Sequence, residues 1–195
     1  AKNIPINLET DSGTSAMSQD QWAGLMQGDE SYFCGRNWYN LEKAVQDFTG
    51  YKYVLAAHQG RAAENIVCTC LIDKPGGVTP ANAHFGTTEV HTRRLGVEPI
   101  NLYMKDSLDT QKSGDFKGNI DLNKLEDMIK KRKPENIPFL NMVLTNNFTA
   151  GQPVSMENLR LASEIARRHG IKVVIDSARV AENAYFIKKR EPGYE

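Results

Sequence analysis

The sequence predicts an α/β protein with a mostly parallel sheet and helices on both faces. Short apolar runs typical of strands alternate along the chain with helical patterns, and the connections between them are short. Crossovers of this kind build a parallel sheet, because each helix packs back onto the strands it joins. The clearest strand is residues 171–175, a β-branched run that ends on Asp176. Open parallel sheets bind ligands outside the carboxyl ends of their strands, so Asp176 is a candidate ligand contact.

The elements follow from periodicity and from the residues that start and stop helices. Ser18 is expected to cap a short helix that ends at Gly28, and a second helix begins at Asn37 and stops at Gly50. Residues 105–119 have no periodicity and form the longest predicted loop. Further helices are predicted over residues 62–71, around His91, and over 122–131 and 156–168; the strands are 51–57, 78–80, 97–103, 139–144 and 171–175.

Polar clusters follow three of these strands: residues 59–61, 146–147 and 176–179. We expect them along one edge of the sheet. Gly60 and Arg61 open a helix, where free N–H groups and a cation suit a phosphate. Gathered together, a phosphate cradle, an amide, a carboxylate and the ring of Phe85 would suit a flat heteroaromatic phosphate.

Each of these features also has a purely structural interpretation. Asp176 can cap the helix that follows it, and on pattern alone the two roles are equally supported. Arg61 can be a surface residue at a helix start. An aromatic residue near a strand end, such as Phe85, is more often part of the core. His58 and His84 have no metal-ligand partners at fixed spacing, so we interpret them as packing residues.

The composition and hydropathy of the chain argue against a nucleic-acid-binding, a membrane or a secreted protein. The 195 residues contain 40% hydrophobic residues, and Lys+Arg and Asp+Glu balance at 24 each, so no positive field attracts nucleic acid or an anionic membrane. No apolar run reaches the ~18 residues of a membrane span, and the N-terminus lacks a signal-peptide layout. We therefore expect a cytoplasmic protein. Cys34, Cys68 and Cys70 match no zinc or redox spacing and are expected to be reduced and mostly buried.

Six collinear segments resemble one family, the β-eliminating lyases, which include tryptophanase and tyrosine phenol-lyase. They are Thr-Asp-Ser-Gly-Thr (10–14), Gly-Asp-Glu-Ser-Tyr (28–32), His-Gln-Gly-Arg (58–61), Phe-Lys-Gly-Asn-Ile-Asp-Leu (116–122), Gly-Gln-Pro-Val-Ser (151–155) and the run 176–188. The resemblance implies a pyridoxal-phosphate (PLP) enzyme of the aspartate-aminotransferase fold type (type I). Residues 1–50 would be an N-terminal active-site and interface segment. Residues 51–195 would be the first part of the PLP-binding large domain, without its remainder and without the small domain.

The resemblance also implies roles for individual residues around the cofactor. Gln59, Gly60 and Arg61 match the loop that binds its phosphate. Phe85 matches the ring that stacks on the pyridine, and Asn147 the amide that contacts the phenolic oxygen.

Three further residues would take part in catalysis. Asp176 matches the partner of the pyridine nitrogen, which stays protonated so that the ring accepts electrons when the substrate loses its α-proton. Arg179 matches the cationic neighbour of the phenolic oxygen. Tyr32 matches an acid near the leaving group that reaches the neighbouring subunit, which implies an oligomer, of the tetramer type.

The remaining matches concern a cation and the substrate pocket. Glu30, with the backbone of Gly13, matches a site for a monovalent cation, potassium. Thr10 and Ser12 lie in the matching active-site loop. Gly86 occupies the position that is usually aspartate in tryptophanases and threonine in tyrosine phenol-lyases, and it has no side chain to recognise the leaving ring.

The sequences of residues 176–179 (Asp-Ser-Ala-Arg) and 186–191 (Phe-Ile-Lys-Lys-Arg-Glu) resemble tryptophanase more closely. That enzyme converts L-tryptophan and water into indole, pyruvate and ammonia. Tyrosine phenol-lyase and a cysteine-type β-lyase remain alternatives within the enzyme class. A non-catalytic partner or regulatory subunit with the PLP fold is the alternative from another class.

No lysine of this chain matches the one that forms the Schiff base in the family, and Lys188 and Lys189 lie too close behind Asp176. We therefore expect a second polypeptide to supply that lysine and the small domain. This chain alone is expected to be inactive, because the exchange of the cofactor onto substrate lacks its nucleophile.

Overall fold

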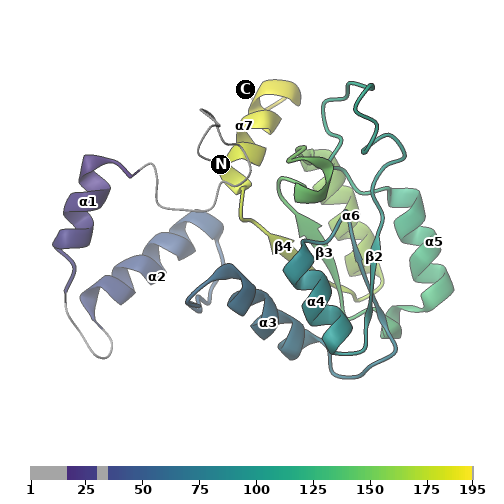
Figure 1. Cartoon of the computed structure of the whole chain (residues 1–195), viewed down its shortest axis with the longest axis horizontal. Helices are drawn as coiled ribbons and strands as arrows, with labels where there is room; N and C mark the ends of the chain where they lie inside the picture. The colour runs from purple at the N-terminus through teal and green to yellow at the C-terminus, as the bar shows by residue number, and fades with distance from the viewer. Residues whose placement is uncertain (1–16, 30–34, 195) are drawn as a thin grey trace, which may run out of the picture. The chain divides into compact units, whose positions relative to one another are not determined.

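A computed structural model of the chain describes residues 17–29 and 35–194 (Figure 1). The chain divides into two compact units, Ala1–Ala56 and Ala57–Glu195.

The first helix of the N-terminal unit, α1, runs over Gln19–Met26 and begins as predicted at Ser18. The Ser18 hydroxyl accepts a hydrogen bond from the Gln21 N–H at 3.1 Å, and the Gln21 side chain accepts one from the Ser18 N–H at 2.8 Å. This reciprocal capping box satisfies two of the N–H groups that a helix start leaves free.

The second helix, α2, covers Arg36–Thr49 and ends at Gly50, whose φ of 72° is the left-handed conformation that favours glycine. Its start is capped from a distance. The Asp29 carboxylate accepts hydrogen bonds from the N–H groups of Arg36 and Asn37 at 2.7 and 3.2 Å. These bonds to the charged form lower the pKa of Asp29.

The predicted strand over residues 51–57 is wrong. This segment has no regular secondary structure, and Tyr51, Tyr53 and Leu55 are exposed. Their alternation with smaller and charged residues mimics a half-buried strand, but a strand also needs a neighbour to pair with, and none of the described strands takes that place.

The C-terminal unit is built on a fully parallel sheet in the order β2-β1-β3-β4. The strands are β1 (Val78–Ala81), β2 (Glu98–Asn101), β3 (Phe139–Val143) and β4 (Lys172–Asp176). Each overlaps a predicted strand, with ends shifted by one or two residues. The prediction of a parallel sheet is confirmed.

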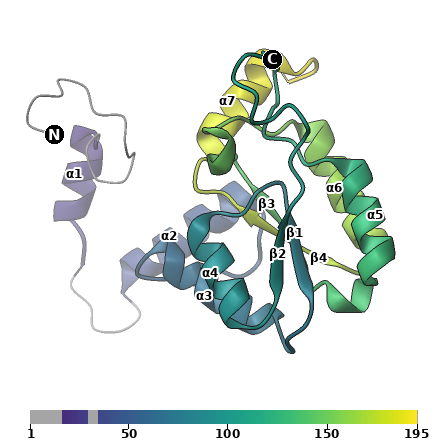
Figure 2. The same cartoon turned by 45° about the vertical axis from the view of Figure 1, so that its right-hand side comes forward.

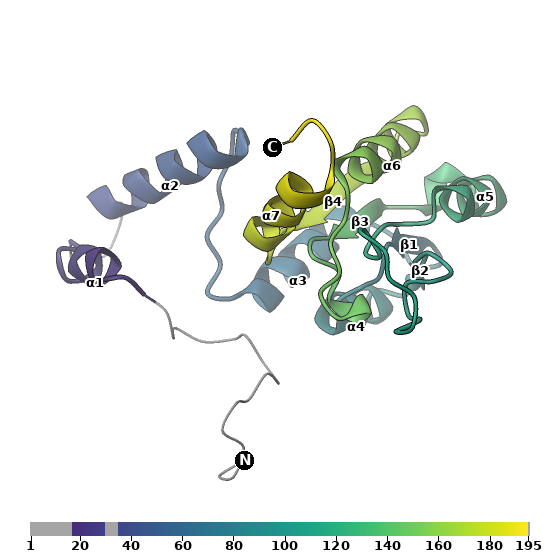
Figure 3. The ribbon, with the colours of Figure 1, turned by 90° about the horizontal axis from the view of Figure 1, so that it is seen from above.

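Helices cover both faces of the sheet. Figure 2 shows α3 (Gly60–Leu71) and α4 (Gly86–Arg94) on one side and α5 (Leu122–Arg132) and α6 (Met156–Arg168) on the other. The view from above in Figure 3 gives the same two layers. The last helix, α7, spans Val180–Arg190, and the short 3-10 turns η1 (Pro134–Asn136) and η2 (Asn147–Thr149) flank β3.

The central strand β3 is buried along its whole length and divides the core in two. Leu140 and Met142 belong to the larger apolar cluster, which also takes side chains from α5 and α6. Phe139 points to the opposite face, into a smaller cluster with Cys68 of α3 and Val97. The alternation follows from the two-residue period of a strand. Of the cysteines, Cys68 is buried as expected, Cys70 is exposed, and Cys34 lies outside the described residues.

Buried asparagines fasten the loops to this core. The side chain of Asn82, just after β1, accepts from the Val143 N–H at 2.9 Å and donates to the carbonyl oxygens of Val143 and Gly118. Asn158 pairs in the same way with both backbone groups of Ile120, and Asn183 with those of Val154. Each amide bonds to the N–H and the C=O of one residue, as a neighbouring strand would, so these buried backbone groups stay hydrogen-bonded.

The Asn82 side chain is expected to be essential to stability. In Asn82→Ala, the N–H and C=O of Val143 lose their buried partner and the C=O of Gly118 keeps only the longer bond from Asn146 at 3.4 Å, which should cost about 2–4 kcal/mol in the free energy of unfolding. The matched control is Asn123→Ala, an exposed residue of α5, for which a change within about 0.5 kcal/mol is expected. Urea unfolding measures both, and equal values for the two variants would contradict this role.

Candidate active site

The carboxyl ends of the parallel strands bring the predicted site residues to one edge of the C-terminal unit. Phe85 and Gly86 follow β1, Asn147 follows β3, and Asp176 and Arg179 end and follow β4. The register aligns Val143 with Asp176, and the pairing continues past it, because the Leu144 N–H donates to the Asp176 carbonyl at 2.9 Å.

The start of α3 offers an anion site. Gln59 precedes the helix without capping it, since its side-chain amide lies 3.1 Å from Nε2 of His58. Among the described residues, nothing accepts a hydrogen bond from the N–H groups of Gly60 and Arg61. A Cβ on Gly60 would meet no heavy atom within 4 Å, so the space beside the Gly60 Cα is open. Two free donors, open space and the exposed Arg61 side chain suit a phosphate.

Asp176 does not cap the helix that follows it. The residue before α7 is Arg179, and the Asp176 carboxylate instead accepts from the Ala178 N–H at 3.1 Å. Burial raises the pKa of Asp176, and the negative charge of Glu64 raises it further, while the Ala178 bond and Arg179 oppose this shift. A carboxylate in this setting gains from a cationic hydrogen-bond donor.

Asn147 and Arg179 lie in direct contact. The Arg179 guanidinium donates from Nη1 to Oδ1 of Asn147 at 2.7 Å, and the Arg179 backbone N–H donates to the Leu144 carbonyl at 3.0 Å. An amide and a cation therefore sit together beside the strand end that carries Asp176.

Phe85 is the last residue before α4, and it is 39% exposed although it is a large apolar residue. The preceding residue, His84, is buried, with its ring Nδ1 2.8 Å from Oδ1 of Asn101 at the end of β2. Burial lowers the pKa of His84, because it disfavours the charged ring. Gly86 begins α4, and a Cβ there would meet nothing within 4 Å.

Sequence reasoning missed Glu64. Its carboxylate, on the second turn of α3, accepts hydrogen bonds from the hydroxyls of Thr87 and, at 2.7 Å, Thr88 on α4. The sequence shows only that Glu64 is the single charged residue of the predicted helix 62–71, four positions after Gly60 and so on the same helix face; its threonine partners lie on another helix.

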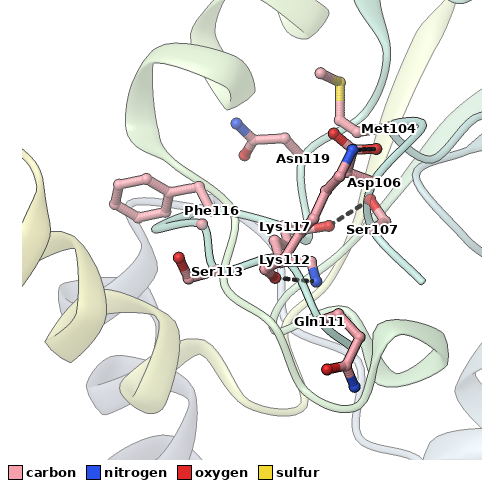
Figure 4. A pocket seen from close by; sticks show the side chains of 10 residues that line it. Met104, Asp106, Ser107, Gln111, Lys112, Ser113, Phe116, Lys117 and Asn119 are labelled. Atoms are coloured by element: carbon pink, nitrogen blue, oxygen red, sulfur yellow. Dashed lines mark hydrogen bonds and ion pairs between the residues drawn. The ribbon is translucent and has the colours of Figure 1, made fainter. Parts of the chain in front are cut away.

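The loop predicted over residues 105–119 lines two hollows of about 590 and 660 Å³, and none of the predicted site residues is part of either lining. Figure 4 shows the first of them. The two lysines that line it bond to other residues of the loop. Lys117 donates to the carbonyl oxygens of Asp109 and Lys112, and Lys112 forms an ion pair with Asp106 at 2.9 Å. The second reaches Phe148, the neighbour of Asn147.

The predicted residues of the N-terminal loops, Thr10, Ser12, Gly13, Glu30 and Tyr32, lie outside the described residues. Within residues 17–29 and 35–194, no three His, Cys, Asp or Glu side chains are grouped to hold a metal ion. No helix in this part of the chain is long and apolar enough to cross a membrane.

Comparison with known proteins identifies the family. A family model described as β-eliminating lyase matches residues 7–191. The chain belongs to the β-eliminating lyases. Its relatives include a tyrosine phenol-lyase of Lacrimispora saccharolytica, 50% identical over 97% of this chain, and one of Nostoc punctiforme, 44% identical over all of it. A probable β-eliminating lyase of Trichomonas vaginalis is 46% identical.

Solved structures confirm the predicted fold type. A PLP-bound C-S lyase from Staphylococcus hominis superposes with a TM-score of 0.56 at 12% identity, over 80% of this chain and 39% of that one. An aminotransferase from Brucella abortus gives 0.54 at 18% identity, over 82% and 39%. The sheet and its helices therefore have the fold of one part of a PLP-dependent type I enzyme.

The chain spans about two fifths of the length of the relatives it matches: 40% of the Lacrimispora protein and 41% of the Nostoc protein. The names of these relatives support the family prediction. They do not support the narrower prediction of a tryptophanase.

Asp176 is expected to destabilise the ligand-free fold at neutral pH. Its raised pKa means that the folded state keeps the proton to higher pH than the unfolded chain, so stability falls as the pH rises from about 4 through the folded pKa. Asp176→Asn keeps the acceptor for Ala178 and removes the charge. The variant should equal the wild type near pH 4 and exceed it in stability at pH 7.

Chemical unfolding between pH 4 and pH 8 measures the difference, with Asp127→Asn on the exposed face of α5 as control. A variant less stable than the wild type at pH 7 would mean that partners stabilise the Asp176 charge more than burial penalises it.

Proposed function

We propose that this chain is the cofactor-binding part of a PLP-dependent β-eliminating lyase that acts on an aromatic amino acid, with L-tyrosine as the leading substrate and L-tryptophan as the alternative. The observations that support the proposal are the carboxylate of Asp176 and the Asn147–Arg179 pair at the carboxyl ends of β3 and β4, together with the free N–H groups at the start of α3. Membership of the β-eliminating lyases makes PLP the group that these residues fit.

The chain's own residues would hold each part of the cofactor. The N–H groups of Gly60 and Arg61, with the Arg61 side chain, would bind the phosphate, and Gln59 would line the same loop. Phe85 would stack on the pyridine ring. Asn147 and Arg179 would hold the phenolic oxygen. The fit rests on the free donors at α3 and on the uncovered space at Gly60.

Asp176 would accept a hydrogen bond from the protonated pyridine nitrogen. Its raised pKa supports this role, because a cationic donor removes the cost of an ionised carboxylate in a half-buried position. Bound PLP supplies an electron-accepting ring that stabilises the charge left when the substrate loses its α-proton. Asp176 keeps the nitrogen proton in place throughout.

The preference for tyrosine rests on the names of the relatives, among which tyrosine phenol-lyases recur at 44–50% identity. Gly86 stands where a side chain could meet the leaving ring, so the chain itself does not decide between phenol and indole. Tyr32 remains the proposed acid for the leaving group, and Thr10 and Ser12 the proposed pocket loop.

Other parts of the predicted enzyme also remain proposals. A lysine from polypeptide beyond these 195 residues would carry the cofactor; the side chains of Lys188 and Lys189 are exposed on α7. Potassium at Glu30 and Gly13, a tetramer-like oligomer and a cytoplasmic location complete the proposal.

The test is product analysis with the fully assembled protein. We expect pyruvate with an equal amount of phenol from L-tyrosine, at a higher kcat/KM than indole from L-tryptophan or sulfide from L-cysteine. A protein that binds PLP and forms pyruvate from none of the three would support a non-catalytic partner instead.

Gly86→Thr is expected to shift leaving-group preference. A Cβ at this position would meet no heavy atom within 4 Å, and the threonine hydroxyl is expected to add a hydrogen bond to a departing phenol, which is worth about 0.5–1.5 kcal/mol, or roughly 2- to 12-fold in rate. The ratio of kcat/KM for tyrosine to that for tryptophan should rise by this factor. Gly86→Ala, which fills the same Cβ position without a hydroxyl, is the control and should leave the ratio unchanged.

A further inference from the structure

Glu64 joins two helices that the proposed site depends on. It lies on α3 four residues after Gly60, and its side chain is half-buried. One carboxylate oxygen accepts from the Thr87 hydroxyl, and the other accepts from the Thr88 hydroxyl at 2.7 Å. Thr88 is only 6% exposed. Hydrogen bonds to a carboxylate are shorter and stronger than those between neutral groups, so this link resists separation of α3 and α4.

The link acts close to two predicted cofactor contacts. Thr87 and Thr88 are the second and third residues of α4, and Phe85 is the residue immediately before that helix. Gly60 and Arg61 begin the helix that carries Glu64. The Glu64 carboxylate therefore sets the position of the Phe85 backbone relative to the free N–H groups at the start of α3.

The charge of Glu64 also reaches the third predicted contact. It adds to burial in raising the pKa of Asp176, and it adds to burial in raising the pKa of Cys68 to about 11. Two cations oppose these effects, Arg179 at Asp176 and Arg94 at Cys68. Glu64 is thus the negative charge that acts on Asp176, and Arg179 is the positive charge that opposes it.

We propose that Glu64 is a positioning residue that aligns the start of α4 with the start of α3 and adds its charge to that of Asp176 in holding a protonated pyridine nitrogen. This inference rests on the proposed function. The carboxylates of Asp176 and Glu64 are both negatively charged, so both would stabilise a pyridinium N–H beside Asp176. Removing the Glu64 charge should then lower both the affinity for the ring and the pKa of its nitrogen.

Two variants separate the charge from the link. Glu64→Gln keeps the shape and can still bond to a threonine hydroxyl, but it has no charge. The double variant Thr87→Val with Thr88→Val keeps the charge and removes both donors. Glu157→Gln, an exposed member of a surface ion pair on α6, is the matched control for loss of a glutamate charge.

The probe is pyridoxamine 5′-phosphate, which has the ring, the nitrogen and the phosphate but needs no lysine to bind. Its dissociation constant and the pKa of its ring nitrogen in the bound state are measured by absorbance between pH 6 and pH 9. We expect Glu64→Gln to weaken binding about 10-fold and to lower the nitrogen pKa by roughly one unit. The double threonine variant should weaken binding and leave that pKa unchanged, and Glu157→Gln should change neither.

The outcomes distinguish this inference from the proposed function. Wild-type protein that does not bind the probe would contradict the proposed function itself. Wild-type binding that Glu64→Gln leaves unaltered, in affinity and in nitrogen pKa, would reduce Glu64 to a link between helices and overturn the charge role. If Glu64→Gln does not fold, the double threonine variant decides: unaltered affinity overturns the positioning role.

Discussion

The site depends on the parallel pairing of β3 with β4. Backbone hydrogen bonds continue beyond both strands: the Leu144 N–H donates to the Asp176 carbonyl, and the Arg179 N–H donates to the Leu144 carbonyl. Because these bonds fix the register, the Arg179 guanidinium reaches the Asn147 amide after β3, and Asp176 stands at the end of β4 beside that pair. A slip of one residue would turn Asp176 to the other face of the sheet. Without a ligand, burial disfavours the charged form of the half-buried Asp176 carboxylate. Ionisable groups with shifted pKa values of this kind are common in binding sites.

Local signals predicted the elements that position this edge. The Ser155 hydroxyl accepts from the Asn158 N–H at 3.1 Å at the start of α6, and the Asp121 carboxylate caps α5 in the same way, because an N-cap depends on neighbouring residues alone. Gly60 and Arg61 begin α3 as predicted, although no side chain caps this helix. The edge position of Asp176 followed from one further rule, that parallel strands share their carboxyl ends.

Features that depend on distant residues were not predictable. The cap on α2 comes from Asp29, seven residues before the helix, and the partners of Asn82 lie 36 and 61 residues away along the chain. The segment 51–57 has a strand pattern and no strand partner. Glu64 could not be assigned to the site because its partners, Thr87 and Thr88, belong to another helix. Composition and periodicity describe one element at a time, whereas these roles arise where two elements meet.

The central claim is that this sheet edge holds PLP with its phosphate at the start of α3 and its pyridine nitrogen at Asp176. A crystal structure of the protein with PLP bound tests it most directly. The account predicts phosphate oxygens within hydrogen-bond distance of the N–H groups of Gly60 and Arg61, and the ring nitrogen within hydrogen-bond distance of the Asp176 carboxylate. A cofactor bound elsewhere, or one whose nitrogen faces away from Asp176, would contradict it.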